Sequence, residues 1–293
     1  MSAQSLEPIA PKPFSKAMRS GVVGPATRGL LGALLFLLTT RTAKYFAWTI
    51  EPPLTAAVLG ANYLGSTLLA ILASREPLWA QGRISISVAL VFSPIMTAAT
   101  FIHLGTFHLH SSGITMVITW FWLIAYGLYP IQLAVLLVKQ LRIPGGDPPR
   151  THPLPFGIKA VLAVHAAVLL PMGVLMFAAP GVARPLWPWN VPALSMRALA
   201  AWSLAFGVLA LHAIIENDVE RVKVVLWGYP ILGVLHIIAL VRFGEVVQWG
   251  EPGAWMYVAF LVSTFVLGAY GLKATRRPKP KRSVPVARTD RTA

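Results

Sequence analysis

The sequence predicts an all-α integral membrane protein with about eight transmembrane helices. Its 293 residues are 56% hydrophobic and only 12% charged, whereas an average soluble protein carries about 25% charged residues. The mean hydropathy is +0.66. The apolar residues gather in eight runs, and each run has the length, about 20 residues, that an α-helix needs to cross the hydrocarbon core of a bilayer.

The boundaries of these runs are marked by charged residues, Pro or Gly. They place the predicted spans at 22–41, 54–74, 85–104, 114–138, 157–179, 194–215, 222–243 and 254–273. The first span is the weakest, because Arg28 interrupts it and the apolar stretch that follows, 29–40, is too short to cross the bilayer alone. This span therefore requires the Arg28 side chain to extend toward the membrane surface.

The basic residues are distributed unevenly between the two sides of the predicted membrane. Of the 25 Lys and Arg residues, 20 lie in the N-terminal segment, the second, fourth and sixth loops, and the C-terminal tail. Because cytoplasmic loops are rich in Lys and Arg, we expect a multi-pass protein of the cytoplasmic membrane with both termini in the cytoplasm. The net charge of +15 then favours anionic lipid headgroups at the basic tail, and no nucleic-acid partner is expected.

The chain is predicted to form two four-helix repeats, at 21–142 and 157–273, joined by a cytoplasmic linker at 143–156. The flanking segments, 1–20 and 274–293, are rich in Pro and charge and poor in apolar residues. Such segments cannot bury enough apolar surface to fold alone. Both are therefore expected to be disordered.

The repeats are predicted from residues of rarer types that recur between the two halves. The matches are Pro94 with Pro230, Glu76 with Glu216, and the Pro-Pro-Leu-Thr element at 52–55 with Pro-Ala-Leu-Ser at 192–195. Each half has an even number of predicted spans, so the repeats are parallel and related by an axis along the membrane normal. The two matching glutamates are expected to pair with the nearby Arg75 or Arg221.

Few residues in the chain are suited to catalysis. There is no cysteine, which excludes disulfides and thiolate sites. None of the ten Asp and Glu residues lies in the middle of a predicted span, where ion-coupled transporters usually carry ionisable groups. The common phosphate-binding, zinc-protease and serine-hydrolase motifs are also missing. We therefore expect a protein that is not an enzyme.

Histidine is the residue type best suited to a binding site. Three histidines crowd the end of the third predicted span: His103, His108 and His110. Imidazole is the commonest metal ligand, so these residues form a candidate metal site. No Asp or Glu lies in the same loop, and the spacing matches no defined zinc motif. A solvated or interfacial cluster is the alternative.

Three further histidines lie within predicted spans: His165, His212 and His236. Two histidines at equal depth on neighbouring helices can ligate a haem iron or a chlorin, which makes these residues candidate cofactor ligands. The alternative is a hydrogen bond to a carbonyl or hydroxyl group on the next helix. We expect this second role, and no bound cofactor.

Tryptophans lie near the predicted extracytoplasmic boundaries. They are Trp48, Trp187, Trp189, Trp249 and Trp255. Tryptophan is enriched where a membrane protein meets the lipid headgroups. We therefore expect these side chains to form an aromatic belt.

Three segments carry a resemblance to a known group of proteins. They are Phe46-Ala-Trp-Thr-Ile-Glu-Pro-Pro-Leu-Thr-Ala-Ala-Val-Leu-Gly60, Leu186-Trp-Pro-Trp189 and Glu216-Asn-Asp218. With these segments the chain resembles, over most of 30–245, a group of bacterial multi-pass membrane proteins that has no assigned activity. The resemblance implies a multi-span fold and a bacterial membrane, and it implies no functional residue.

The function is predicted only by elimination. The leading prediction is a non-catalytic subunit or scaffold of a membrane complex, with other membrane subunits as partners. One alternative is a transporter or permease for a neutral or lipophilic solute. It would be favoured by a common cavity facing Asn62, Tyr63, Tyr126 and His236. The other alternative is a redox subunit that binds haem or a pigment through the membrane histidines.

Overall fold

The computed structural model describes residues 10–23 and 26–275. In this part of the chain seven helices are long and apolar enough to cross a membrane, and no β-strand forms. The seven are α4 (Pro53–Ser74), α5 (Trp79–Ile102), α6 (Gly113–Leu141), α7 (Phe156–Ala178), α9 (Ala193–Glu216), α10 (Val219–Phe243) and α11 (Pro252–Thr275). The prediction of an all-α, multi-pass membrane protein is confirmed.

Shorter helices lie before and between these seven. They are α1 (Lys16–Val23), α2 (Ala26–Leu37), α3 (Thr42–Tyr45) and α8 (Pro180–Ala183), with 3-10 turns η1 (Thr39–Arg41), η2 (Leu104–Thr106), η3 (Arg184–Leu186) and η4 (Gly244–Val246). The region predicted as the first span, 22–41, contains the end of α1, the whole of α2 and η1 instead of one long helix.

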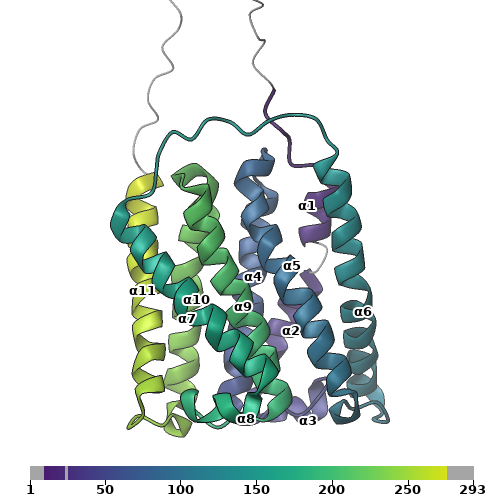
Figure 1. The fold of residues 1–293 in the computed structure, drawn as a ribbon. Helices are drawn as coiled ribbons and strands as arrows, with labels where there is room; N and C mark the ends of the chain where they lie inside the picture. The colour runs from purple at the N-terminus through teal and green to yellow at the C-terminus, as the bar shows by residue number, and fades with distance from the viewer. Residues whose placement is uncertain (1–9, 24–25, 276–293) are drawn as a thin grey trace, which may run out of the picture.

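The helices form one bundle in which all long elements run roughly side by side (Figure 1). Both ends of the described chain lie at the same end of the bundle as the connection between α6 and α7. We refer to this as the terminal end. The short helices α3 and α8 lie at the opposite end (Figure 1).

The centre of the bundle is made by α4 and α9, which are the most buried of the long helices. Helix α4 packs along α2 and α10, and α9 packs along α7 and α5. The outer helices α6 and α11 pack mainly on α5 and α10, respectively. Each half of the chain therefore contributes one central helix, and each central helix packs against a helix of the other half.

Close packing of α2 on α4 depends on glycine. A Cβ atom on Gly60 would lie 2.6 Å from the backbone nitrogen of Phe36, and one on Gly32 would lie 2.6 Å from the Cβ of Tyr63. Neither position can accept a larger side chain without moving the backbone. Small residues at helix crossings are a common way to gain packing contacts within lipid.

Residues 10–20 differ from the prediction of disorder, because they lie against the terminal end of the bundle. Phe14 and Met18 are buried in a cluster with Trp79 of α5 and Leu133 of α6, and the Phe14 amide donates to the Pro77 carbonyl at 2.9 Å. The two apolar side chains supply the surface burial that composition alone does not reveal. The predictions for 1–9 and for 276–293 lie outside the described residues.

Candidate functional site

A cavity of about 500 Å³ lies between α7, α9, α10 and α11 of the second half and α4 of the first. This volume is in the range of small-molecule sites, about 300–1,000 Å³. Its walls are mainly Val, Leu, Met and aromatic side chains, and none of the described residues that line it is Asp, Glu, Lys or Arg. The cavity therefore suits an uncharged, largely apolar molecule.

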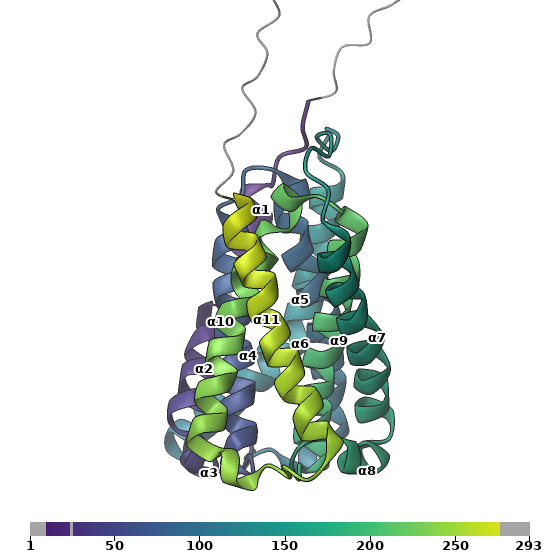
Figure 2. The ribbon, with the colours of Figure 1, turned by 90° about the vertical axis from the view of Figure 1, so that its left-hand side faces the viewer.

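The mouth of the cavity lies between α7 and α11. Val164 and Val168 of α7 line it from one side and Met256 of α11 from the other, and all three side chains are exposed on the outer surface of the bundle. Helix α11 is inclined across this face, with α10 on one side and α7 and α9 on the other (Figure 2). Because α7 and α11 touch each other at few points, the cavity opens on the side of the bundle, between exposed apolar side chains.

The inner wall of the cavity carries a chain of three polar side chains, Asn62, His236 and Tyr257. The Nε2 atom of His236 lies 3.0 Å from Oδ1 of Asn62, and an amide oxygen can only accept, so Nε2 carries the proton. The hydroxyl of Tyr257 then donates to Nδ1 of His236 at 2.7 Å. Both ring nitrogens of His236 are thus engaged in its neutral form.

His165 also lines the cavity, on α7. Its Nε2 atom lies 2.6 Å from Oγ of Ser263 on α11, and the Ser263 hydroxyl in turn donates to the carbonyl of Phe260 at 2.6 Å. Nε2 is therefore the donor, which leaves Nδ1 as an acceptor. Nδ1 is buried and has no hydrogen-bond partner within the described chain.

Two tryptophans in the cavity wall, Trp187 and Trp202, carry buried indole N–H groups that find no partner among the described residues. A buried donor without a partner costs about 1–3 kcal/mol, and most buried polar groups in proteins are paired. Unpaired polar groups gathered in the wall of one apolar cavity are typical of a site that is completed by a ligand.

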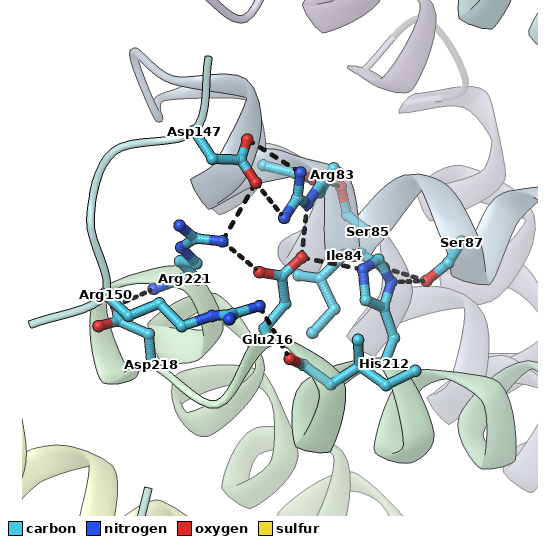
Figure 3. Close-up of polar contacts among 12 residues, drawn as sticks. Arg83, Ile84, Ser85, Ser87, Asp147, Arg150, His212, Glu216, Asp218 and Arg221 are labelled. Carbon is cyan, nitrogen blue, oxygen red and sulfur yellow. Dashed lines mark hydrogen bonds and ion pairs between the residues drawn. The ribbon is translucent and has the colours of Figure 1, made fainter. Parts of the chain in front are cut away.

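A cluster of ionisable side chains forms a second polar region, at the terminal end (Figure 3). Glu216, only 2% exposed, accepts from Nε of Arg83 at 2.5 Å, from Nη1 of Arg221 at 2.9 Å and from Nε2 of His212 at 3.1 Å. Asp147 bridges the two arginines, at 2.7 Å from Arg83 and 3.2 Å from Arg221. The two carboxylates and the two guanidinium groups balance in charge.

The same cluster fixes the connection between the two halves. Asp218 caps α10 by accepting from the amides of Glu220 and Arg221, as N-cap aspartates do. It also accepts from the amides of Thr151 and His152 in the connection, at 2.7 and 3.0 Å. These contacts tie the connection to the bundle, so the cluster is interpreted as a structural tie.

Two ion pairs at the terminal end are reciprocal between the halves. Glu76 at the end of α4 pairs with Lys223 of α10 at 2.9 Å, and Glu216 at the end of α9 pairs with Arg83 of α5 at 2.5 Å. The two glutamates are 140 residues apart, and so are the two basic residues. Of the pairs expected from the sequence, Glu216 with Arg221 forms, whereas the described partner of Glu76 is Lys223.

A second reciprocal pair of contacts lies at the opposite end. The indole N–H of Trp48 donates to Oγ of Ser195 at 3.5 Å, and that of Trp189 donates to Oγ1 of Thr55 at 2.8 Å. Both indoles are buried. Trp48 and Trp189 therefore join the halves and do not lie in an aromatic belt at the lipid surface.

The remaining predicted belt residues have different environments. Trp249 and Trp255 are exposed, as expected for an aromatic belt, and their rings contact each other with centroids 6.0 Å apart. Trp187 is partly buried in the cavity wall. The hydroxyl groups that the buried indoles contact are those of Thr55, in the Pro-Pro-Leu-Thr element, and Ser195, in its counterpart at 192–195.

The three predicted metal ligands do not converge. Nε2 of His103 accepts from Nη1 of Arg197 at 2.6 Å, and burial, followed by the Arg197 charge, lowers the pKa of His103. His108 contacts the Phe46 carbonyl at 2.9 Å, and His110 is exposed. Within the described residues no three His, Cys, Asp or Glu side chains form a group that could hold a metal ion.

The three predicted cofactor ligands are divided between the two polar regions. His165 and His236 line the cavity, whereas His212 contacts Ser87 at 3.0 Å and Glu216 in the charged cluster. Each histidine thus contacts a side chain of another helix through at least one ring nitrogen. Sequence reasoning did not identify the contributions of Trp187 and Ser263.

Comparisons with protein families, with curated proteins and with solved structures found no match for this chain. The resemblance to a group of bacterial membrane proteins therefore stays a prediction. The geometry of the cavity and of the charged cluster is what supports a function.

Proposed function

We propose that this protein binds a neutral lipophilic molecule in the cavity between α7 and α11, as a carrier or permease that takes its solute from the bilayer. The observation that carries the proposal is the sideways opening between these two helices, lined by exposed apolar side chains. An apolar solute concentrates in lipid, so an opening in the lipid-facing surface gives it a direct path to the site.

The cavity favours the transporter alternative over a scaffold, because a scaffold has no need of a ligand cavity. Two of the four residues named for that alternative, Asn62 and His236, line one cavity. The other two, Tyr63 and Tyr126, contact each other through their hydroxyl groups at 2.6 Å. The predicted set is therefore divided: Asn62 of the first half and His236 of the second line the proposed site, and the two tyrosines do not.

We propose further that the chain crosses the membrane eight times, as two parallel four-helix repeats with the terminal end in the cytoplasm. In this arrangement α1 and α2 together make the first crossing. The reciprocal contacts at both ends of the bundle support the repeat, and the position of both described chain ends on one side supports an even number of crossings. Reporter fusions after Arg150 should be cytoplasmic and those after His110 extracytoplasmic, and the reverse result would refute the orientation.

A haem or pigment is not part of the proposal. Both ring nitrogens of His236 are engaged, with Asn62 and Tyr257, so Nδ1 of His165 has no second histidine lone pair in the cavity lining to form an axial pair with it. An axial ligand needs a free nitrogen lone pair aimed at the metal. A stoichiometric Soret band in the purified protein, lost in His165→Ala, would restore the redox alternative.

The binding proposal is tested by blocking the mouth of the cavity. Purified protein is titrated with diphenylhexatriene, a hydrocarbon fluorophore, and binding is read from energy transfer out of the protein tryptophans. The double variant Val164→Phe, Val168→Phe fills the mouth and should weaken saturable binding at least about tenfold, since the apolar contacts of the site become inaccessible.

The matched control is the double variant Val174→Phe, Val262→Phe. It places the same two side chains on exposed positions of α7 and α11 that do not line the cavity. Its binding should equal that of the unaltered protein. Equal binding by all three proteins would show that the fluorophore does not use the cavity and would overturn the proposal.

A further inference from the structure

The polar atoms of the cavity identify the chemical class of its ligand, an inference that rests on the proposed function. We propose that the ligand is an uncharged lipophilic carbonyl compound, a ketone or a quinone, whose oxygen accepts a hydrogen bond from the side-chain amide of Asn62. Only non-covalent binding is involved.

The Asn62 amide is held in one orientation by its neighbours. Its side chain is 3% exposed, and its Oδ1 atom accepts from Nε2 of His236, whose other nitrogen accepts from Tyr257. Turning the amide over would require the other tautomer of His236, in which Nδ1–H donates to Tyr257, and the Tyr257 hydroxyl proton would then have no acceptor among its described partners. Nδ2 of Asn62 is therefore the free atom, and it makes no hydrogen bond to any described residue although Asn62 lines the cavity.

The other unpaired polar groups in the wall include further donors. The indole N–H groups of Trp187 and Trp202 have no partner in the described structure. Nδ1 of His165, an acceptor, also has no partner there. Trp187 lies next to the hydrogen-bonded side chains of Asn62, His236 and Tyr257, since its ring centroid is 6.2 Å from that of Tyr257. A carbonyl oxygen with two lone pairs complements neighbouring donors of this kind.

The absence of charged side chains from the described lining restricts the ligand further. Transfer of an isolated carboxylate or ammonium group into an apolar site is strongly unfavourable unless a counter-ion meets it. The lining residues supply none. The exposed apolar side chains at the mouth, Val164 and Met256, leave room for a hydrocarbon tail that extends into the bilayer.

The test uses four probes of equal chain length: a methyl ketone, an alkane, a carboxylate and an ammonium compound. Each is titrated against bound diphenylhexatriene. The ketone should displace the fluorophore at a concentration about tenfold lower than the alkane, since one buried hydrogen bond separates them. The two ions should be the weakest competitors. A benzoquinone with a matched tail then distinguishes the two carbonyl classes. The compound that displaces the fluorophore at the lower concentration identifies the class.

The role of Asn62 is tested with Asn62→Leu. The substitution should remove the advantage of the ketone and leave alkane binding unchanged. Thr119→Val, which alters a buried polar residue of α6 that bonds only within its own helix, should retain the advantage. A ketone labelled with ¹³C at the carbonyl provides a second readout: its stretching frequency should fall on binding to the unaltered protein, which decides the question even if Asn62→Leu does not fold.

The outcomes separate this inference from the proposed function. The carbonyl assignment would be overturned if ketone and alkane displaced the fluorophore equally and the carbonyl frequency did not shift. If the mouth-blocking variant then bound neither probe, the cavity would remain as a hydrocarbon site. Binding of the fluorophore that is insensitive to the mouth-blocking variant would overturn both.

Discussion

Each half of this chain contains a hydrogen bond donated by an aromatic side chain to the neighbouring helix. Side chains fill the space around this bond in the first half, and a cavity borders it in the second. In the first half the indole N–H of Trp122 donates to Thr100 at 3.1 Å. In the second half the Tyr257 hydroxyl donates to His236 at 2.7 Å. Thr100 and His236 are 136 residues apart, as are Pro94 and Pro230, which is about one helical turn from the 140-residue spacing of Arg83 and Lys223 on the same two helices.

The surroundings of these two pairs differ. Trp122 is fully buried among aromatic rings, with centroids 4.3 Å from Tyr126, 5.0 Å from Trp48 and 5.4 Å from Phe46. Tyr257 borders the cavity. Similar helix arrangements can therefore form a packed core or border a cavity, depending on how much of the interior the side chains fill.

The largest expected effect comes from emptying the filled half. Trp122→Ala should lower the free energy of unfolding by about 4 kcal/mol, because the surrounding rings cannot collapse fully into the space of an indole. Tyr257→Ala should cost about half as much, because its side chain already borders empty space. Equilibrium unfolding in mixed detergent micelles measures both.

Added indole provides the control for this prediction. It should recover part of the stability of Trp122→Ala by binding the new space, and it should not stabilise the unaltered protein to the same extent. Equal losses in the two alanine variants would contradict the distinction between a filled and a hollow half.

A smaller effect is expected at the reciprocal ion pairs. Glu216→Gln leaves Arg221 buried beside a neutral partner and should cost about 3 kcal/mol, the lower part of the range for breaking a buried pair, because Asp147 still contacts both arginines. Glu76→Gln breaks the more exposed pair with Lys223 and should cost less than about 1 kcal/mol. The same unfolding measurement compares the two, and a larger loss in Glu76→Gln would reverse the assignment.

The smallest expected effect is a pH dependence where the halves meet at the opposite end. The folded protein lowers the pKa of His103, through burial and the charge of Arg197, so the unfolded chain binds this proton more readily. Stability should therefore fall as the pH drops below the ordinary histidine pKa of about 6.5 and level off below the folded pKa.

His103→Gln should reduce this slope, measured as the unfolding midpoint against pH. Arg197→Gln removes one of the two causes, so the His103 resonance in that variant should titrate at a higher pH than in the unaltered protein. An unchanged His103 titration in Arg197→Gln would show that the contact at 2.6 Å does not influence protonation.

The sequence predicted the long helices well because bilayer thickness sets the length of an apolar run. Seven predicted spans coincide with long helices to within six residues at each end. The region around α1 and α2 was predicted less well, since a charge and a proline interrupt its pattern. Burial of Phe14 and Met18 also escaped prediction, because two apolar residues in a Pro-rich segment give no periodic signal.

The candidate site could be predicted only in part. His165 and His236 stood out as polar residues in apolar runs, and both line the cavity. Their partners could not be predicted, because hydrogen bonds between helices join residues far apart in the chain: Asn62 and His236 are separated by 174 positions. The cavity itself depends on how α7 and α11 diverge, and helix periodicity carries no information on that angle.

The reciprocal contacts have a consequence for the order in which the protein is made. Trp48 and Glu76 emerge early from the ribosome, whereas their partners Ser195 and Lys223 follow more than a hundred residues later. The first half of the chain is therefore made before the residues that pair with this indole donor and this carboxylate. Ser195 on α9 and then Lys223 on α10 supply these partners, so both contacts form only once the second half of the chain has been made.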